Sequence, residues 1–234
     1  MGTAAGGQGL PHVGEKSLAE PFVVYGASTS GSVPIEATLS LLNLPYRVED
    51  HAPWEGSHEA ERLARINALR QVPALALPTG ELMTESAAIL IWLADSHPEA
   101  RLAPALTDAT RPAFLRWMTF VSSAIYALYW VADDPSRVVD RAEDHATVKA
   151  RLYERIAHCW EQMGAQLQPG RYLLGEELSV LDLYVATASR WSPGRSRFYD
   201  VAPGLADTIR RVDADPRLAA LWAERFPFTP GWER

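Results

Sequence analysis

The stretch that decides the fold is residues 71–86, which read QVPALALPTGELMTES. Its apolar runs at 72–77 and 81–84 flank Pro78-Thr79-Gly80, and turn residues between two such runs predict a β-hairpin. Pro73 stands at the start of the first strand, where a proline donates no hydrogen bond to a sheet. A cis bond before Pro73 would turn the backbone N–H and C=O of Val72 toward a ligand. A trans proline on an edge strand is the alternative interpretation.

The end of this stretch is a candidate anion site. Glu85-Ser86 follows the hairpin and begins a helix with apolar positions up to Leu93. A helix N-terminus offers free N–H groups and a partial positive charge, so a carboxylate would bind there with the Ser86 hydroxyl as an added donor. A serine that only caps the helix is the alternative.

The elements before the hairpin complete a small α/β domain. In order, they are a strand at 22–25, a polar turn at 26–32, a helix at 33–44, a strand at 46–49 and a helix near 59–66. Ser32 occupies the N-cap position of the first helix, and Pro34 is tolerated in its first turn. A right-handed crossover would place the second strand parallel to the first.

Strand patterns stop after residue 84. Helical patterns fill residues 112–131, 143–167, 180–191 and 203–224 instead. We therefore expect a disordered tail at 1–20, an α/β domain at 21–97, a linker at 98–104 and an all-helical domain at 105–234.

Composition limits the classes of partner. The 234 residues carry a net charge of −7, which disfavours nucleic acid and anionic membranes. Cys159 is the sole cysteine, so no intrachain disulfide forms, as suits a reducing cytosol. Residues 1–20 hold no apolar run, and no stretch reaches 18 apolar residues. We therefore expect a cytoplasmic protein without a signal peptide or a membrane span.

Three short motifs, in this order and spacing, resemble the glutathione S-transferase superfamily. The family's Val-Pro, followed about a dozen residues later by Glu-Ser, stands here as Val72-Pro73 and Glu85-Ser86. Residues 67–73 resemble its Asn-Pro-x-Gly-x-Val-Pro, with the first proline and the glycine replaced. Gly175-x-x-x-Ser179-x-x-Asp182 resembles its buried capping box, in which Asp182 reaches back to the Ser179 backbone. The resemblance covers roughly residues 22–230.

The resemblance implies a thioredoxin-like domain followed by an all-helical bundle. It also implies a homodimer that serves in detoxification, adding glutathione as a thiolate to a small hydrophobic electrophile, without a metal. Val72 would bind the cysteinyl backbone of glutathione, and Pro73 would be the cis proline. Glu85 would pair with the γ-glutamyl ammonium and Ser86 with its carboxylate, while Gln71 would contact the glycyl end.

The thiol-activating residue is less well defined. The family places Tyr, Ser, Cys or Thr in the turn after the first strand. Counting back from residues 44–46 without a gap gives Thr29, and a one-residue slip that aligns Pro34 with a proline of some bacterial members gives Ser30. Ser28 also stays open. The residue must lower a thiol pKa from near 8.5 by about two units, which needs roughly 2.7 kcal/mol. One hydroxyl donor and the adjacent helix N-terminus could supply that.

The electrophile pocket would lie between the domains. Aromatic residues that crowd the first helix of the second half are its candidate lining: Trp117, Tyr126, Tyr129 and Trp130. Aromatic residues at helical spacing more often belong to a core or a dimer interface. We therefore expect two of five residues, these four and Phe114, to face the cleft. Trp191 and Trp232 could reach the same region.

Other classes of function fit the sequence less well. Thiol–disulfide exchange needs a cysteine in the turn at 26–32, which has none. Residues 26–30 are a near miss to the nucleophile elbow of serine hydrolases, but the last histidine, His158, falls in a predicted helix. His51 and His58 lack partners at metal-ligand spacing and are expected to be solvated. The remaining alternative is a non-catalytic binding or scaffold protein with the glutathione-binding fold.

Overall fold

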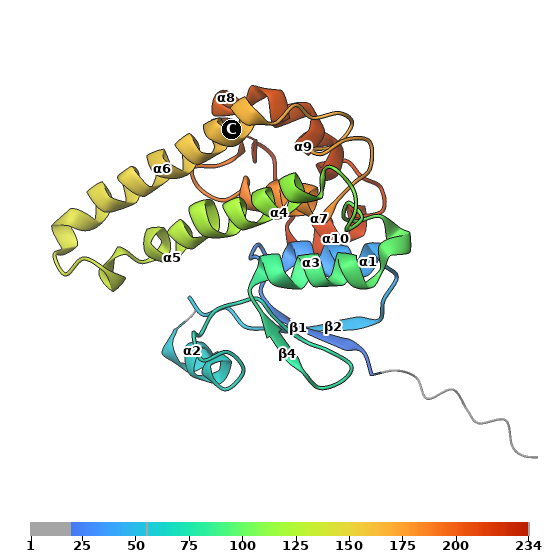
Figure 1. Cartoon of the computed structure of the whole chain (residues 1–234). Helices are drawn as coiled ribbons and strands as arrows, with labels where there is room; N and C mark the ends of the chain where they lie inside the picture. The colour runs from blue at the N-terminus through green and yellow to red at the C-terminus, as the bar shows by residue number, and fades with distance from the viewer. Residues whose placement is uncertain (1–19, 55, 234) are drawn as a thin grey trace, which may run out of the picture.

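The computed structural model describes residues 20–54 and 56–233 and contains a small α/β half and a larger helical half (Figure 1). The predicted fold, a thioredoxin-like α/β domain followed by helices, is confirmed. The predicted tail at 1–20 lies outside the described residues, apart from Glu20.

A four-stranded mixed sheet forms the α/β half. Its strands are β1 (Phe22–Gly26), β2 (Tyr46–Asp50), β3 (Ala74–Ala76) and β4 (Leu82–Thr84), in the order β2-β1-β3-β4. The β2 strand is parallel to β1, as the crossover rule predicts, and β3 runs antiparallel to both β1 and β4. Tyr25 pairs with Ala74, and Ala74 pairs with Thr84. The end of β1, the start of β3 and the end of β4 therefore lie at one edge of the sheet.

Three α-helices belong to this half: α1 (Val33–Leu41), α2 (Ser57–Ala64) and α3 (Ser86–Ser96). Figure 1 shows α1 and α3 between the sheet and the helical half, with α2 on the other side. The first seven residues of α1 are buried, Glu36 among them. A helix covered on two sides is expected to be apolar all round, which makes this one carboxylate exceptional.

The helical half follows a short 3₁₀ turn at Pro98–Ala100. Its helices are α4 (Arg111–Phe120), a π-helical segment (Val121–Tyr126), α5 (Ala127–Asp133), α6 (His145–Gln166), α7 (Val180–Ala188), α8 (Arg195–Val201), α9 (Ala206–Asp213) and α10 (Ala219–Arg225). Further 3₁₀ turns lie at Pro135–Arg137, Ala142–Asp144 and Pro203–Leu205. All nine residues of α7 are buried, and this helix packs against α1, α3, α4 and α9.

A buried capping box fixes the start of α7. Asp182 accepts hydrogen bonds from the Ser179 N–H at 2.8 Å and the Ser179 hydroxyl at 2.6 Å. Its other oxygen accepts from the Leu173 N–H at 2.8 Å. Burial outweighs these bonds and raises the pKa of Asp182 to about 6.

Several boundaries differ from the sequence-based expectation. The first helix ends at Leu41 rather than residue 44, and Asn43 takes a left-handed φ of 53°. The helix expected at 203–224 is divided into a 3₁₀ turn, α9 and α10, because Pro216 disfavours helical backbone at the residue before it. The α8 helix was missed because its seven residues show no apolar period.

Candidate active site

Three segments with candidate site residues meet at one edge of the sheet. They are the turn after β1, the Val72-Pro73 pair before β3, and Glu85-Ser86 after β4. The Val72-Pro73 peptide bond is cis. Glu85 is exposed, with a left-handed φ of 66°, and occupies the N-cap position of α3. The register of the strands therefore brings together residues that lie up to about sixty positions apart.

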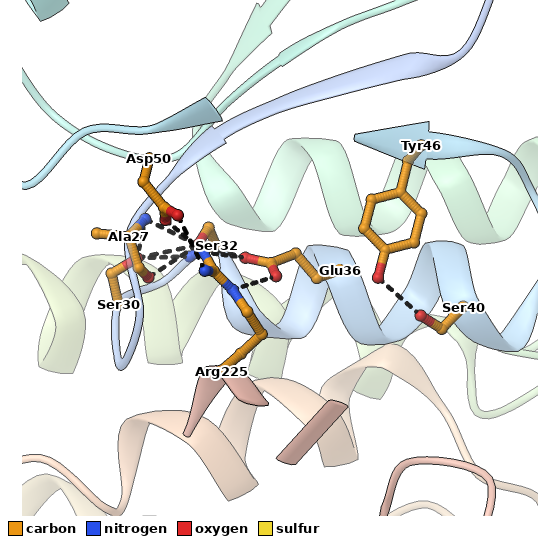
Figure 2. A network of polar contacts seen from close by, with 8 residues as sticks. All are labelled: Ala27, Ser30, Ser32, Glu36, Ser40, Tyr46, Asp50 and Arg225. Atoms are coloured by element: carbon orange, nitrogen blue, oxygen red, sulfur yellow. Dashed lines mark hydrogen bonds and ion pairs between the residues drawn. The ribbon is translucent and has the colours of Figure 1, made fainter. Parts of the chain in front are cut away.

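A compact hydrogen-bond network fills the turn after β1 (Figure 2). The Ser30 hydroxyl donates to the Ala27 carbonyl at 2.7 Å and lies 3.0 Å from the Ser32 hydroxyl. Ser32 occupies the predicted N-cap position of α1, but its side chain makes no capping bond. The Ser32 hydroxyl instead donates to Glu36 at 2.8 Å, which ties the turn to the first helix.

Glu36 is held by an arginine from the last helix. The Arg225 guanidinium pairs with Glu36 at 2.7 Å and with Asp50, at the end of β2, at 2.7 Å (Figure 2). Glu36 is 1 % exposed, whereas the Asp50 side chain is mostly solvated. Burial raises the pKa of Glu36, and the charge of Arg225 offsets part of that rise. The turn is therefore joined through a buried ion pair to α10.

The helical half also forms hydrogen bonds with the backbone of the turn. The Thr29 N–H donates to the Arg225 carbonyl at 2.8 Å, and the Trp191 indole N–H donates to the Thr29 carbonyl at 2.6 Å. Thr29 has a left-handed φ of 63°. The side chains of Ser28 and Thr29 are exposed, while that of Ser30 is buried. The three predicted hydroxyls thus occupy one turn in different surroundings.

Tyr126 connects this turn with Val72. Its hydroxyl donates to the Val72 carbonyl at 3.3 Å. A Cβ atom placed on Gly31 would lie 2.3 Å from the same oxygen, so the tyrosine occupies the space that a side chain at position 31 would need. The Tyr126 ring meets Trp191 edge-on, with centroids 5.0 Å apart. Burial raises the pKa of the Tyr126 phenol well above its usual range.

Ser86 meets a second tyrosine of the helical half. Its hydroxyl is buried and lies 2.7 Å from the hydroxyl of Tyr184, on α7. Burial raises the pKa of Tyr184 to about 12, so the phenol keeps its proton at neutral pH. Gln71 is exposed at the same edge of the sheet. Tyr184 can therefore donate to Ser86 while Ser86 donates to a ligand.

Two of the four predicted aromatic residues share a neighbour, because Tyr126 and Tyr129 both meet the Trp191 ring edge-on, at 5.0 and 5.1 Å. Trp117 and Trp130 have other neighbours. Tyr126 is the one that contacts Val72 and Gly31. Trp117 is buried against Phe120, and the buried Tyr129 directs its hydroxyl at the Ala188 carbonyl. Trp130 is 44 % exposed and lies beneath the guanidinium of Arg137.

The sequence analysis did not identify three residues of this region: Glu36, Tyr184 and Arg225. The sequence could have indicated a special role for Glu36, because it is the single charged residue in the helix sequence VPIEATLSL. Tyr184 is likewise a polar-tipped residue in the apolar helix α7. No sequence pattern pointed to Arg225, because arginine is common in this chain and the partners of Arg225 lie more than 170 residues away.

Metal and membrane signals are weak in the part of the chain that the structure describes. Residues 20–54 and 56–233 contain no group of three His, Cys, Asp or Glu side chains placed to hold a metal ion. The expectation of a solvated His51 is wrong, because it is buried beside the ring of Tyr25. Among the described helices, none combines the length and the apolar character that crossing a bilayer requires.

Comparisons with known proteins point to one family. Residues 32–96 match the family model "Glutathione S-transferase, N-terminal domain". The uncharacterized GST-like protein YncG of Escherichia coli K12 is 33 % identical over 198 residues, which span 83 % of this chain and 94 % of that protein. A glutathione S-transferase from Pseudomonas fluorescens aligns with a TM-score of 0.68 and 26 % identity, covering 85 % of this chain and 97 % of that one. A glutathione transferase homolog from Sulfitobacter, solved with bound glutathione, aligns with a TM-score of 0.76 at 24 % identity over 86 % and 96 % of the two chains.

Proposed function

The chain belongs to the glutathione S-transferase superfamily, and from that premise we propose that it is a glutathione transferase that adds the glutathione thiolate to a hydrophobic electrophile. One observation carries the proposal. The turn after β1, the cis Val72-Pro73 pair and Glu85-Ser86 share one edge of the sheet. These are the segments that the family resemblance assigns to the thiol, the cysteinyl backbone and the γ-glutamyl end of glutathione.

The proposed binding mode uses complementary charges and backbone groups. The cysteinyl unit of glutathione pairs with the N–H and C=O of Val72 as an added strand would. The γ-glutamyl ammonium pairs with Glu85, and its carboxylate accepts from Ser86 and from the N-terminus of α3. Gln71 contacts the glycyl end. The solvent exposure of Glu85 and Gln71 supports this assignment, because both side chains are open to a ligand.

A hydroxyl group in the turn after β1 activates the glutathione thiol. The candidates are Ser28, Thr29 and Ser30, and we favour Ser30 because the network of Ala27 and Ser32 holds its side chain in place. A donor to sulfur and the N-terminus of α1 stabilise the thiolate, whose proton passes to solvent. The thiolate then forms a C–S bond with the electrophile, and the displaced electron pair leaves with the leaving group or moves onto the electrophile.

The co-substrate of this proposal is apolar. Tyr126 and Trp191 place aromatic edges beside the turn, where an aromatic or aliphatic electrophile would pack. Tyr129 packs against Trp191 at 5.1 Å but is buried, so we assign it support of that ring rather than contact with the electrophile. Trp117 and Trp130 have other neighbours, and we assign them no direct contact. We also propose a cytoplasmic homodimer, for which sedimentation of the purified protein is the test of assembly.

Isothermal titration with reduced glutathione tests binding, and conjugation to an activated aryl halide tests catalysis. Micromolar to millimolar binding with enzyme-dependent conjugation supports the proposal. Absence of binding, repeated with S-hexylglutathione, would refute it. Binding without conjugation to any electrophile tried would favour a non-catalytic glutathione-binding protein. One contact favours that second function, since the hydrogen of Ser30 is already donated to Ala27.

A further inference from the structure

The Tyr126 hydroxyl lies between the two backbone segments that face the proposed thiol. On one side it donates to the Val72 carbonyl, and on the other it touches Gly31 in the turn. Val72 belongs to the strand edge and Gly31 to the segment just before α1, while Tyr126 comes from the helical half. A sulfur atom attached to a cysteinyl unit paired with Val72 would lie within reach of this hydroxyl.

The bond from Tyr126 is the more easily redirected of the two hydroxyl bonds here. An O–H···O bond is strongest near 2.7–2.8 Å. The Ser30 hydroxyl donates to Ala27 at 2.7 Å, whereas the Tyr126 hydroxyl donates to Val72 at 3.3 Å. The Tyr126 hydrogen therefore loses less interaction energy when a better acceptor, such as a thiolate, arrives.

Neighbouring rings hold Tyr126 in this position. Trp191 packs edge-on against it at 5.0 Å, and Tyr184 lies at 6.2 Å. Trp191 is itself bound to the Thr29 carbonyl at 2.6 Å. A donor whose orientation is fixed before the reaction stabilises developing charge without a cost of reorganisation.

The phenol also keeps its hydrogen across the physiological pH range. Burial is the main cause of its raised pKa, and the charges of Asp133 and Glu85 act in the same direction. The backbone of Gly31 has a smaller, opposite effect. A neutral phenol is a hydrogen-bond donor, which is the property that a thiolate requires of its partner.

We propose that Tyr126 is a catalytic residue, whose hydroxyl leaves the Val72 carbonyl when glutathione binds and donates a hydrogen bond to the glutathione sulfur. This rests on the proposed function, in which the cysteinyl N–H takes over the Val72 carbonyl. The thiol proton goes to solvent, and the tyrosine keeps its own. Tyr126 then acts with the hydroxyl of the turn, so that the two halves of the protein stabilise one thiolate.

Tyr126→Phe in the full chain tests this, with Tyr46→Phe as the matched control. Tyr46 also donates or accepts through a part-buried hydroxyl, to Ser40 at 2.9 Å, but at the other end of α1 (Figure 2). The thiol pKa of bound glutathione is measured from the ultraviolet absorbance of the thiolate against pH. Isothermal titration with S-methylglutathione, which has no thiol, measures binding separately from activation.

Tyr126→Phe should raise the pKa of the bound thiol by about one unit, a tenfold loss of thiolate below that pKa. It should leave the affinity for S-methylglutathione within about threefold, and Tyr46→Phe should change neither quantity. An unchanged thiol pKa in Tyr126→Phe would overturn the inference while leaving glutathione binding intact. So would a loss of S-methylglutathione affinity without a pKa change, which would make Tyr126 a binding residue. Failure of the unaltered chain to bind glutathione would overturn the proposed function and this inference with it.

Discussion

Arg225 offers a quantitative test of how the helical half supports the turn. Arg225→Met keeps most of the aliphatic length and removes the guanidinium that pairs with Glu36 and Asp50. Removing one partner of a buried ion pair costs about 3–5 kcal/mol, because the other charge stays buried without compensation. The Asp50 side chain is 62 % exposed, so its share is about 0–1 kcal/mol. We therefore expect the free energy of unfolding to fall by about 3–5 kcal/mol at pH 7.

Glu36→Gln identifies the source of this loss. A glutamine still accepts the hydrogen bond from Ser32 and carries no charge, while Arg225 retains Asp50. Added to Arg225→Met, it removes the uncompensated carboxylate, so the double variant should be more stable than Arg225→Met alone. Urea unfolding of the four proteins gives the coupling energy directly. Arg197→Met is the control, since both side chains of its pair with Glu154 are exposed, by 42 % and 73 %, and the pair should contribute about 0–1 kcal/mol.

The pH dependence of Arg225→Met follows from the same pair. Without Arg225, the largest influence that lowers the pKa of Glu36 is gone, and burial with the nearby Asp50 charge raises it further. A carboxyl whose pKa is higher in the folded state contributes stability at low pH that is lost as pH rises through that pKa. The deficit of the variant relative to the unaltered chain should therefore shrink from pH 7 to pH 5. Equal deficits at both pH values, or strictly additive effects in the double variant, would refute the reasoning.

Three further predictions concern the site and its supports. Ser86→Ala should raise the glutathione Kd measured by calorimetry about tenfold, because a hydrogen bond to a charged group contributes about 1.5–3 kcal/mol. Tyr184→Phe should raise the Kd less, since Tyr184 contacts Ser86 and not the ligand. An unchanged Kd in Ser86→Ala would show that Ser86 does not bind the γ-glutamyl carboxylate. The pKa of Asp182 is near 6 in the folded state and about 3.9 in the unfolded state, so its ionisation should lower the free energy of unfolding by roughly 2–3 kcal/mol as pH rises from 4 to 7. Asp182→Asn should lack this pH-dependent loss in urea unfolding. The same dependence of stability on pH in the variant and the unaltered chain would contradict the pKa shift. Gly31→Ala should displace Tyr126, because two of its ring carbons would lie 2.7 and 2.8 Å from the new methyl group. The free energy of unfolding should fall by about 1–3 kcal/mol, measured by thermal unfolding. An unaltered melting temperature would show that the turn has room for a side chain.

The sequence was most informative where a residue type has a restricted backbone role. Pro73 cannot donate to a sheet, so its place at the start of a strand marked a special backbone, and the bond before it is cis. Apolar periods predicted the βα order of the first half, and the crossover rule predicted the parallel pairing of β1 with β2. The capping box at Ser179 and Asp182 has the predicted hydrogen bonds. Local chemistry determines each of these features.

The sequence was least informative about contacts between the halves. The partner of Glu36 lies 189 residues away, and no local pattern distinguishes Arg225 from the other arginines. The aromatic residues of 117–130 share one helical pattern in the sequence. Tyr126 differs from the others because its side chain packs against Gly31 and Val72. Such choices depend on tertiary geometry, which periodicity does not encode.

The ion pair of Glu36 with Arg225 has a consequence for the order of events during biosynthesis. The ribosome adds about 5–20 residues per second, so a partner 189 residues downstream follows Glu36 by roughly 10–40 seconds. Throughout that interval the nascent α/β half carries the single charge of α1 without the arginine that pairs with it. An unpaired carboxylate is costly to bury, so we expect α1 to reach its final buried position only once Arg225 is present. The proposed glutathione site would then be completed only after the last helix has been synthesised.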